Sequence, residues 1–133
     1  MNEFYNQAKH NETFLIAIEQ SFPDDYFDWK ITVIYYTSIH LLKCLAKKRN
    51  VNIGATHQDI AASLNPRRGK QITPFPTWAW DKYEDLLRYS KTSRYDGISD
   101  RSVTLIAQKN NYKECQKSFS SFCSYMKKNN IEL

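Results

Sequence analysis

The segment from Tyr26 to Arg49 constrains the fold most, because it contains neither glycine nor proline and repeats apolar residues at helical spacing. Its apolar face consists of Ile31, Ile34, Tyr35, Ser38, Leu41, Leu42 and Leu45, widened by Trp29, Val33 and Ile39. A helix that is apolar around so much of its circumference must be covered on several sides. The segment therefore predicts a long helix at the centre of a helical bundle.

Helical spacing and helix-ending residues predict further helices along the chain. Their ranges are Phe4–Ser21, where the spacing is imperfect, His57–Leu64, Trp78–Ser93, and Ser99 or Asp100 to Lys128. We expect Asp24 or Asp25 to cap the helix that begins at Tyr26, and Thr56 to cap the short helix. No segment alternates as a strand would. The sequence thus predicts an all-α fold, an up-and-down bundle of four to five helices, as a single domain over residues 1–133.

Composition narrows the class of protein. Only three glycines and four prolines occur in 133 residues, which argues against a β-sandwich or barrel. The most apolar stretch, Ile31–Ala46, is too short and too interrupted to span a bilayer, and the N-terminus lacks the features of a signal peptide, so we expect a cytoplasmic protein with no membrane association. Cys44, Cys115 and Cys123 have no metal-binding spacing, and we expect them to pack as small apolar side chains, with no metal or cofactor.

Charge is distributed unevenly. Residues 1–28 contain one base and six acids, although the formal net charge of the chain is +5. Bases concentrate between residues 43 and 70, where Asp59 is the single acid. They are Lys43, Lys47, Lys48, Arg49, Arg67, Arg68 and Lys70, and a second group, Lys109, Lys113 and Lys117, repeats every four residues. Such groups are usual on a solvated surface, and they also suit an anionic partner such as RNA or a nucleotide.

The predicted central helix also carries one polar stripe. Its members are Thr32, Tyr36, His40, Lys43 and Lys47. His40 lies one turn after Tyr36 and one turn before Lys43, so the three share a face. A histidine can act as a base near neutral pH, and cations stabilise phosphate charge. The stripe is therefore a candidate site, and the alternative is a core histidine that bonds to a tyrosine or a carbonyl.

Two stretches together resemble a known family. WKITVIYYTSIHLLKCLAKKR, residues 29–49, joins a double tyrosine to an aliphatic–His–aliphatic step, and Thr56-His57 follows the next loop. YEDLLRYSKTSRYDG, residues 83–97, carries Arg94-Tyr95 near its end. In this order the features resemble HEPN domains, the helical domains related to higher-eukaryote and prokaryote nucleotide-binding proteins. The resemblance implies a four- or five-helix bundle that often dimerises.

The resemblance also implies activities and site residues. Many HEPN domains are metal-independent endoribonucleases with Arg followed after four to six residues by His, whereas seven residues separate Arg49 from His57 here. The standard spacing is therefore absent, and the candidate catalytic residues are His40, His57 and Arg94. The candidate binding residues are Tyr36, Lys43, Lys47, Arg49, Arg67, Arg68 and Tyr95.

Three functions stay open. The first is an RNA- or nucleotide-interaction module of a toxin–antitoxin or defence system, and the second is a divergent metal-independent endoribonuclease. The third is a structural protein–protein adaptor that uses exposed aromatic residues such as Trp78 and Trp80. We expect a two-fold homodimer, with Tyr89 also at its interface, or a stable complex with a small protein such as a nucleotidyltransferase. Salt-dependent RNA binding separates the first function from the third, and cleavage in EDTA separates the second from both.

Overall fold

The chain folds into helices. A computed structural model describes residues 2–95 and 101–133, with side chains except at 94–95 and 101–104, and these ranges contain no strand. The helices are α1 (Glu3–Ser21), α2 (Phe27–Lys48), α3 (His57–Leu64), α4 (Thr77–Tyr95) and α5 (Arg101–Lys128). The prediction of an all-α bundle is confirmed. No helix within the described residues is long and apolar enough to cross a membrane.

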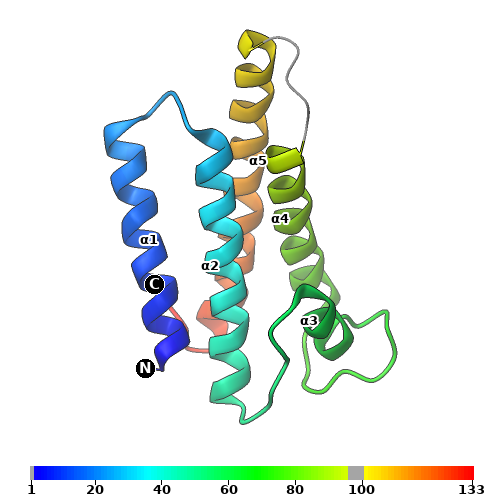
Figure 1. Ribbon diagram of the computed structural model, residues 1–133. Coiled ribbons are helices and arrows are strands. Elements are labelled where there is room, and N and C mark those ends of the chain that lie inside the picture. The colour runs from blue at the N-terminus through cyan, green and yellow to red at the C-terminus, as the bar shows by residue number, and fades with distance from the viewer. Residues whose placement is uncertain (1, 96–100) are drawn as a thin grey trace.

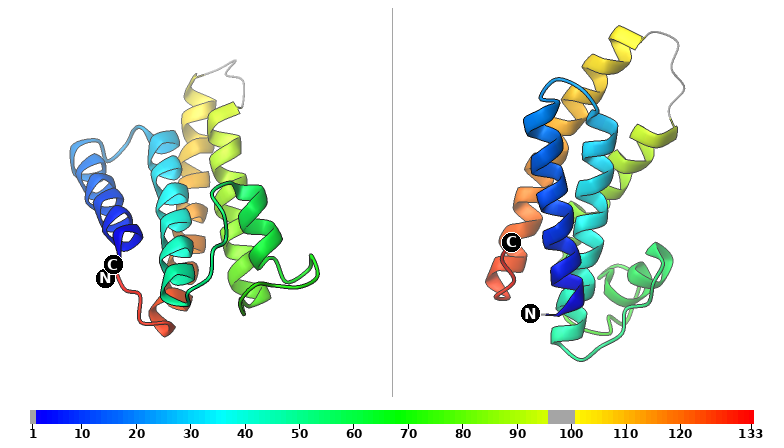
Figure 2. Two further views of the ribbon diagram at one scale, coloured as in Figure 1. Left: turned by 60° about the horizontal axis from the view of Figure 1, so that its bottom comes forward. Right: turned by 60° about the vertical axis from the view of Figure 1, so that its left-hand side comes forward.

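The four long helices run alternately up and down, with α2 at the centre (Figure 1). Helix α2 packs against α1, α4 and α5, and α4 packs against α5. The short helix α3 lies at the lower end of α4, and the two chain ends lie close together (Figures 1 and 2). The Tyr5 hydroxyl donates a 2.7 Å hydrogen bond to the Glu132 carbonyl, which joins the start of α1 to the C-terminal segment.

Helix α2 contributes more buried residues than any other helix in the described part of the chain, as its apolar pattern predicts. All seven residues of the predicted apolar face are buried. Trp29 departs from the prediction, because 62% of it is exposed. The other departure is Lys30, which is fully buried although lysine is seldom found inside a protein.

Two oxygen atoms and two aromatic rings surround the ammonium group of Lys30 and compensate for its burial. Its Nζ donates a 2.6 Å hydrogen bond to the carbonyl of Phe22 and lies 3.4 Å from Oε1 of Glu19. The ammonium also lies 4.8 Å and 5.5 Å from the ring centres of Phe27 and Tyr112, within the range of cation–π attraction. Lys30 thereby ties the turn between α1 and α2 to the bundle.

The helix starts confirm one predicted cap and correct another. At α3, the Thr56 side chain accepts from the amide of Asp59, and the Asp59 carboxylate accepts from the amide of Thr56, a complete capping box. At α2, the predicted cap by Asp24 or Asp25 is wrong, because Tyr26 is the N-cap and makes no side-chain capping bond. The tight turn places Tyr26 in the left-handed region, with φ 58°, so the Asp25 carboxylate accepts from the Tyr26 amide inside the turn. The cap expected at residues 99–100 lies outside the described residues.

Two predictions about individual side chains have opposite outcomes. The prediction that Trp80 is exposed at an interface is wrong, because Trp80 is fully buried. Trp78, in contrast, is 41% exposed. Trp80 lies three residues before the fully buried Tyr83, on the inner face of α4, and its indole N–H donates to Glu84 at 2.9 Å. The cysteines pack as predicted, with Cys123 half-buried against the core.

Candidate functional site

His40 lies on the outward stripe of α2. Its Nδ1 is 2.8 Å from the carbonyl oxygen of Tyr36, one turn earlier. A carbonyl only accepts, so Nδ1 carries the proton of this hydrogen bond. The side chain is half-buried rather than in the core, and Tyr36 beside it is 43% exposed. His40 is therefore fixed by a carbonyl and remains open to solvent.

His57, in contrast, belongs to the packing between α3 and α4. Its Nδ1 lies 2.9 Å from the hydroxyl of Tyr83, which lies 3.4 Å from the hydroxyl of Tyr35 on α2. The imidazole also stacks on Trp80 at 6.5 Å between ring centres. Burial is the largest cause that lowers the pKa of His57, so the ring is neutral at pH 7. Burial likewise raises the pKa of Tyr83, which stays a neutral phenol.

The structure gives each histidine its own neighbours. Among the described residues, no hydrogen bond, ion pair or ring contact joins His40 to His57. The side chains of Arg94 and Tyr95 lie outside the described part of the chain. A single polar cleft formed by His40, His57 and Arg94 therefore stays a prediction.

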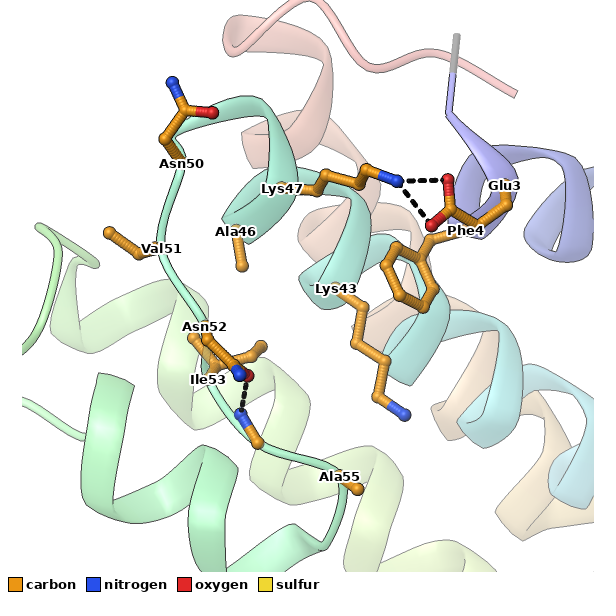
Figure 3. A pocket seen from close by; sticks show the side chains of 11 residues that line it. Glu3, Phe4, Lys43, Ala46, Lys47, Asn50, Val51, Asn52, Ile53 and Ala55 are labelled. Atoms are coloured by element: carbon orange, nitrogen blue, oxygen red, sulfur yellow. Dashed lines mark hydrogen bonds and ion pairs between the residues drawn. The ribbon is translucent and has the colours of Figure 1, made fainter.

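An open pocket of about 550 Å³ lies where the C-terminal turns of α2 meet the start of α1 and the loop after α2 (Figure 3). Two predicted binding residues, Lys43 and Lys47, stand together on one wall. The full lining is Glu3, Phe4, Lys43, Ala46, Lys47, Asn50, Val51, Asn52, Ile53, Gly54 and Ala55. The structure thus brings part of the basic segment onto a concave surface.

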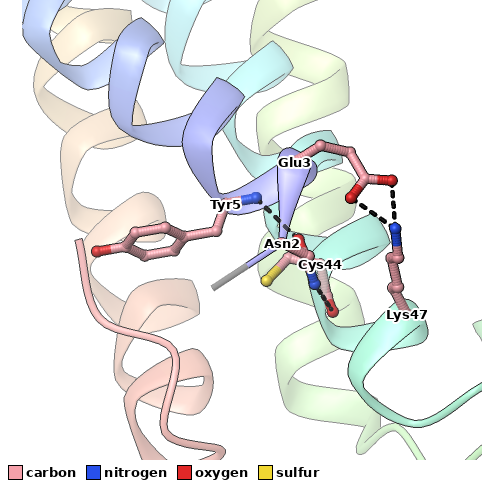
Figure 4. Close-up of polar contacts among 5 residues, drawn as sticks. All are labelled: Asn2, Glu3, Tyr5, Cys44 and Lys47. Carbon is pink, nitrogen blue, oxygen red and sulfur yellow. Dashed lines mark hydrogen bonds and ion pairs between the residues drawn. The ribbon is translucent and has the colours of Figure 1, made fainter.

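The two lysines differ in their partners. Lys47 Nζ donates to both carboxylate oxygens of Glu3, and this hydrogen bond is the main reason that the pKa of Glu3 is lowered (Figures 3 and 4). Lys43 is half-buried and has no ion pair or hydrogen bond within the described residues, and its side chain extends away from Lys47 and Glu3 (Figure 3). Lys43 is consequently the lysine whose charge is available to a ligand.

Local bonds fix the two walls that face Lys43. On α1, the Asn2 side chain accepts from the Tyr5 amide at 3.1 Å and donates to the Cys44 carbonyl at 3.2 Å, which anchors the helix start on α2 (Figure 4). In the loop, the Asn52 side chain accepts from the amide of Gly54 at 2.8 Å. The pocket is therefore preorganised.

Gly54 is required at this place in the loop. Its φ is +82°, a region that side chains disfavour, and an added Cβ would lie 2.3 Å from Cβ of Asp59. Asp59 cannot move away without losing the cap of α3. The sequence pattern predicts the Thr56 cap but not the need for glycine before it, and the signal that links the two is the short spacing from Gly54 through Thr56 to Asp59.

The remaining predicted binding residues are mostly engaged by protein groups. Arg49 donates to the Pro74 carbonyl, to the Tyr125 hydroxyl at 3.1 Å and to Asn129 Oδ1 at 2.9 Å. Arg67 pairs with both oxygens of the Asp81 carboxylate, at 2.6 and 3.2 Å, which lowers the pKa of Asp81.

Arg68 differs from these two arginines. It is exposed, and no side-chain partner for it occurs in the described part of the chain. The basic segment is therefore divided between structural arginines and open cations.

The chain was compared with protein-family models, with curated proteins and with solved structures, and none of the three comparisons finds a match.

Proposed function

We propose that this chain is an RNA- or nucleotide-interaction module, as its resemblance to HEPN domains implies, and that the pocket beside Lys43 receives a phosphate group of the ligand. The observation that carries the proposal is a half-buried lysine on the wall of an open, preorganised pocket, with no ion pair to any described residue. A lysine held in this way contributes charge to a ligand without first breaking an internal pair. Phosphate is the anion common to RNA and nucleotides.

Aromatic rings beside the pocket suit a base next to the phosphate. Phe4 lines the pocket, and Tyr36 lies on the same stripe of α2, two turns before Lys43, with 43% of its surface exposed. Single-stranded nucleic acids are bound by such combinations of cations and aromatic platforms, since every base has a face that stacks. A bound RNA strand would run along the polar stripe of α2 from Tyr36 to Lys47.

The test is binding of a fluorescently labelled single-stranded RNA, about 12 nucleotides long, measured by anisotropy at low salt. Lys43→Ala should weaken binding several-fold, because it removes the open cation. Lys117→Ala is the matched control, since it removes the same charge from α5, where Lys117 lies 3.2 Å from Glu114. Equal losses in both variants, or no binding to wild type, would contradict the proposal.

A second candidate is the divergent metal-independent ribonuclease. The observation that favours it is the Nδ1 of His57 at 2.9 Å from the Tyr83 hydroxyl, which orients the ring, and burial lowers the pKa of this histidine as suits a general base. Its test is cleavage of the same RNA in EDTA, followed by gel electrophoresis, with His40→Ala and His57→Ala as variants. Loss of a general base lowers the rate about 10²- to 10⁴-fold. Cleavage that persists in both variants would exclude these histidines.

We also propose that the module acts in the cytoplasm within a toxin–antitoxin or defence system, as a two-fold homodimer or beside a protein partner such as a nucleotidyltransferase. The support is the family resemblance, together with exposed apolar side chains such as Ile72 and Trp78. Sedimentation analysis at micromolar concentration, alone and with the product of the neighbouring gene, tests it. A monomer under both conditions would count against the assembly.

A further inference from the structure

A second concave surface lies at the other end of the α1–α2 pair, and its side chains are almost entirely apolar. Five residues line it, with a volume of about 350 Å³: Phe14, Ile18, Phe22, Tyr26 and Trp29. Four of them are strongly exposed, from 43% for Tyr26 to 62% for Trp29. We call these five residues the aromatic groove. Exposed apolar groups gathered in this way mark an interaction surface rather than ordinary surface variation.

The aromatic groove is held in shape from below. Lys30, fully buried, fixes the carbonyl of Phe22, and the Phe22 and Tyr26 rings meet edge to face with centres 4.8 Å apart. Tyr26 has φ 58°, an uncommon conformation for a large side chain. A fully buried lysine and a tyrosine in the left-handed conformation thus hold rings that remain exposed to solvent. Such uncommon features concentrate at functional surfaces.

The chain segment that forms the aromatic groove carries charged side chains of one sign only. From Phe14 to Trp29 the sequence contains four acids and no lysine or arginine: Glu19, Asp24, Asp25 and Asp28. Glu19 is balanced by Lys30, and Asp24, whose side chain is 86% exposed, lies 3.9 Å from Lys109 on α5. Neither Asp25 nor Asp28 has an ion pair within the described residues. Two carboxylates that flank the groove residues in the sequence, Asp25 and Asp28, are therefore without a basic partner in the described part of the chain.

We infer that the aromatic groove receives a basic amphipathic helix of a partner protein. Phe14, Ile18 and Phe22 follow each other at intervals of four residues, so their wall is about 12 Å long and matches two turns of a bound helix. Apolar anchors of the partner at positions i, i+4 and i+7 enter the groove, and its lysines or arginines face Asp25 and Asp28. Charge complementarity favours a basic helix over RNA, an anionic lipid surface or a second copy of this chain. RNA and anionic lipid are repelled, and a two-fold contact between copies would bring the same acids together.

The probe is a synthetic helical peptide of about 14 residues, with leucines on one face and lysines beside them, compared with the same peptide carrying glutamates in place of lysines. Binding is measured by titration calorimetry. The lysine peptide should bind, and the glutamate peptide should bind at least about tenfold more weakly. Asp25→Lys combined with Asp28→Lys should reverse this preference. Equal binding of both peptides, or none at millimolar concentration, would overturn the inference.

Substitutions in the aromatic groove locate the contact. Phe14→Ala and Trp29→Ala should each weaken binding of the lysine peptide about tenfold, because exposed aromatic anchors contribute most of such affinities. Ile16→Ala is the matched control, since Ile16 is 49% exposed on α1 and does not line the groove, and it should change nothing. Thermal melting verifies that each variant folds. A dimer that Phe14→Ala dissociates would assign the groove to a second copy and overturn the inference. RNA binding through Lys43 uses a different surface, so either proposal can fail alone.

Discussion

The two ends of the α1–α2 pair use lysine in opposite ways. At the turn between the helices, Lys30 is fully buried, bonded to a carbonyl and paired with Glu19, and the surface above it is apolar and acidic. At the other end, Lys43 lies at an open pocket without an ion pair in the described residues, next to Lys47. The difference teaches that a lysine's role follows from what surrounds it, since the same side chain supports the fold at one end and offers charge at the other.

The largest expected difference between the two lysines is the effect of their substitution on the free energy of unfolding. Lys30→Ala should lower the free energy of unfolding by about 2–4 kcal/mol, because it removes the bond to the Phe22 carbonyl and the pair with Glu19 and opens a cavity in the core. Lys43→Ala should change it by no more than about 0.5 kcal/mol. Urea denaturation measures both. Similar effects of the two substitutions would remove the distinction between the ends.

Arg49 sharpens the comparison, because it lies at the pocket end and is nevertheless structural. Arg49→Ala should lower the free energy of unfolding by about 1–3 kcal/mol, since its guanidinium joins the end of α2 to the loop at Pro74 and to α5 at Tyr125. Arg68→Ala, which removes an exposed arginine, is the matched control and should have little effect. Equal stability of the two variants in urea would show that the Arg49 contacts contribute nothing.

The salt dependence of RNA binding tests how many cations at the pocket end are open. Six phosphate contacts, by Lys43, Lys47, Lys48, Arg49, Arg67 and Arg68, would give a log–log slope of about −4 for a single strand, at about −0.7 for each contact. Contacts by Lys43 and Arg68 alone, whose side chains have no ion pair or hydrogen bond within the described residues, give about −1.4. Since Arg49 and Arg67 are occupied by protein groups, we expect the shallower slope in an anisotropy titration across salt concentrations. A slope near −4 would mean that RNA displaces those internal bonds.

The smallest expected effect is the pH dependence of stability that His57 causes. His57 begins α3, just beyond the loop that lines the pocket. Burial lowers the pKa of His57, so the unfolded chain binds a proton there more readily than the folded chain. Stability from this residue is complete above the unfolded pKa of about 6.5 and is lost as the pH falls through the folded pKa. His57→Gln should flatten this decline between pH 7.5 and pH 5, roughly the span over which histidine titrates, as followed by thermal melting. An unchanged pH profile would assign the decline to other groups.

Local patterns in the sequence determine most of the fold. The apolar face of α2, the bounds of α3 and its Thr56 cap follow from spacing and from hydrogen bonds between near neighbours, which the sequence states directly. The imperfect spacing in α1 is also informative, because Phe14 is 56% exposed and Ala8 is the buried residue of that helix. These features depend on periodicity and capping chemistry, and both act over only a few residues.

Only the tertiary structure decides which polar and aromatic groups are free. Lys30 and Lys43 are similar in the sequence, and so are Trp78 and Trp80, yet one of each pair is buried and the other is accessible. Their partners come from distant segments, as when Tyr112 on α5 meets Lys30. Packing of whole helices sets these long-range contacts. The availability of a charge or a ring to a ligand is therefore fixed only when the helices assemble.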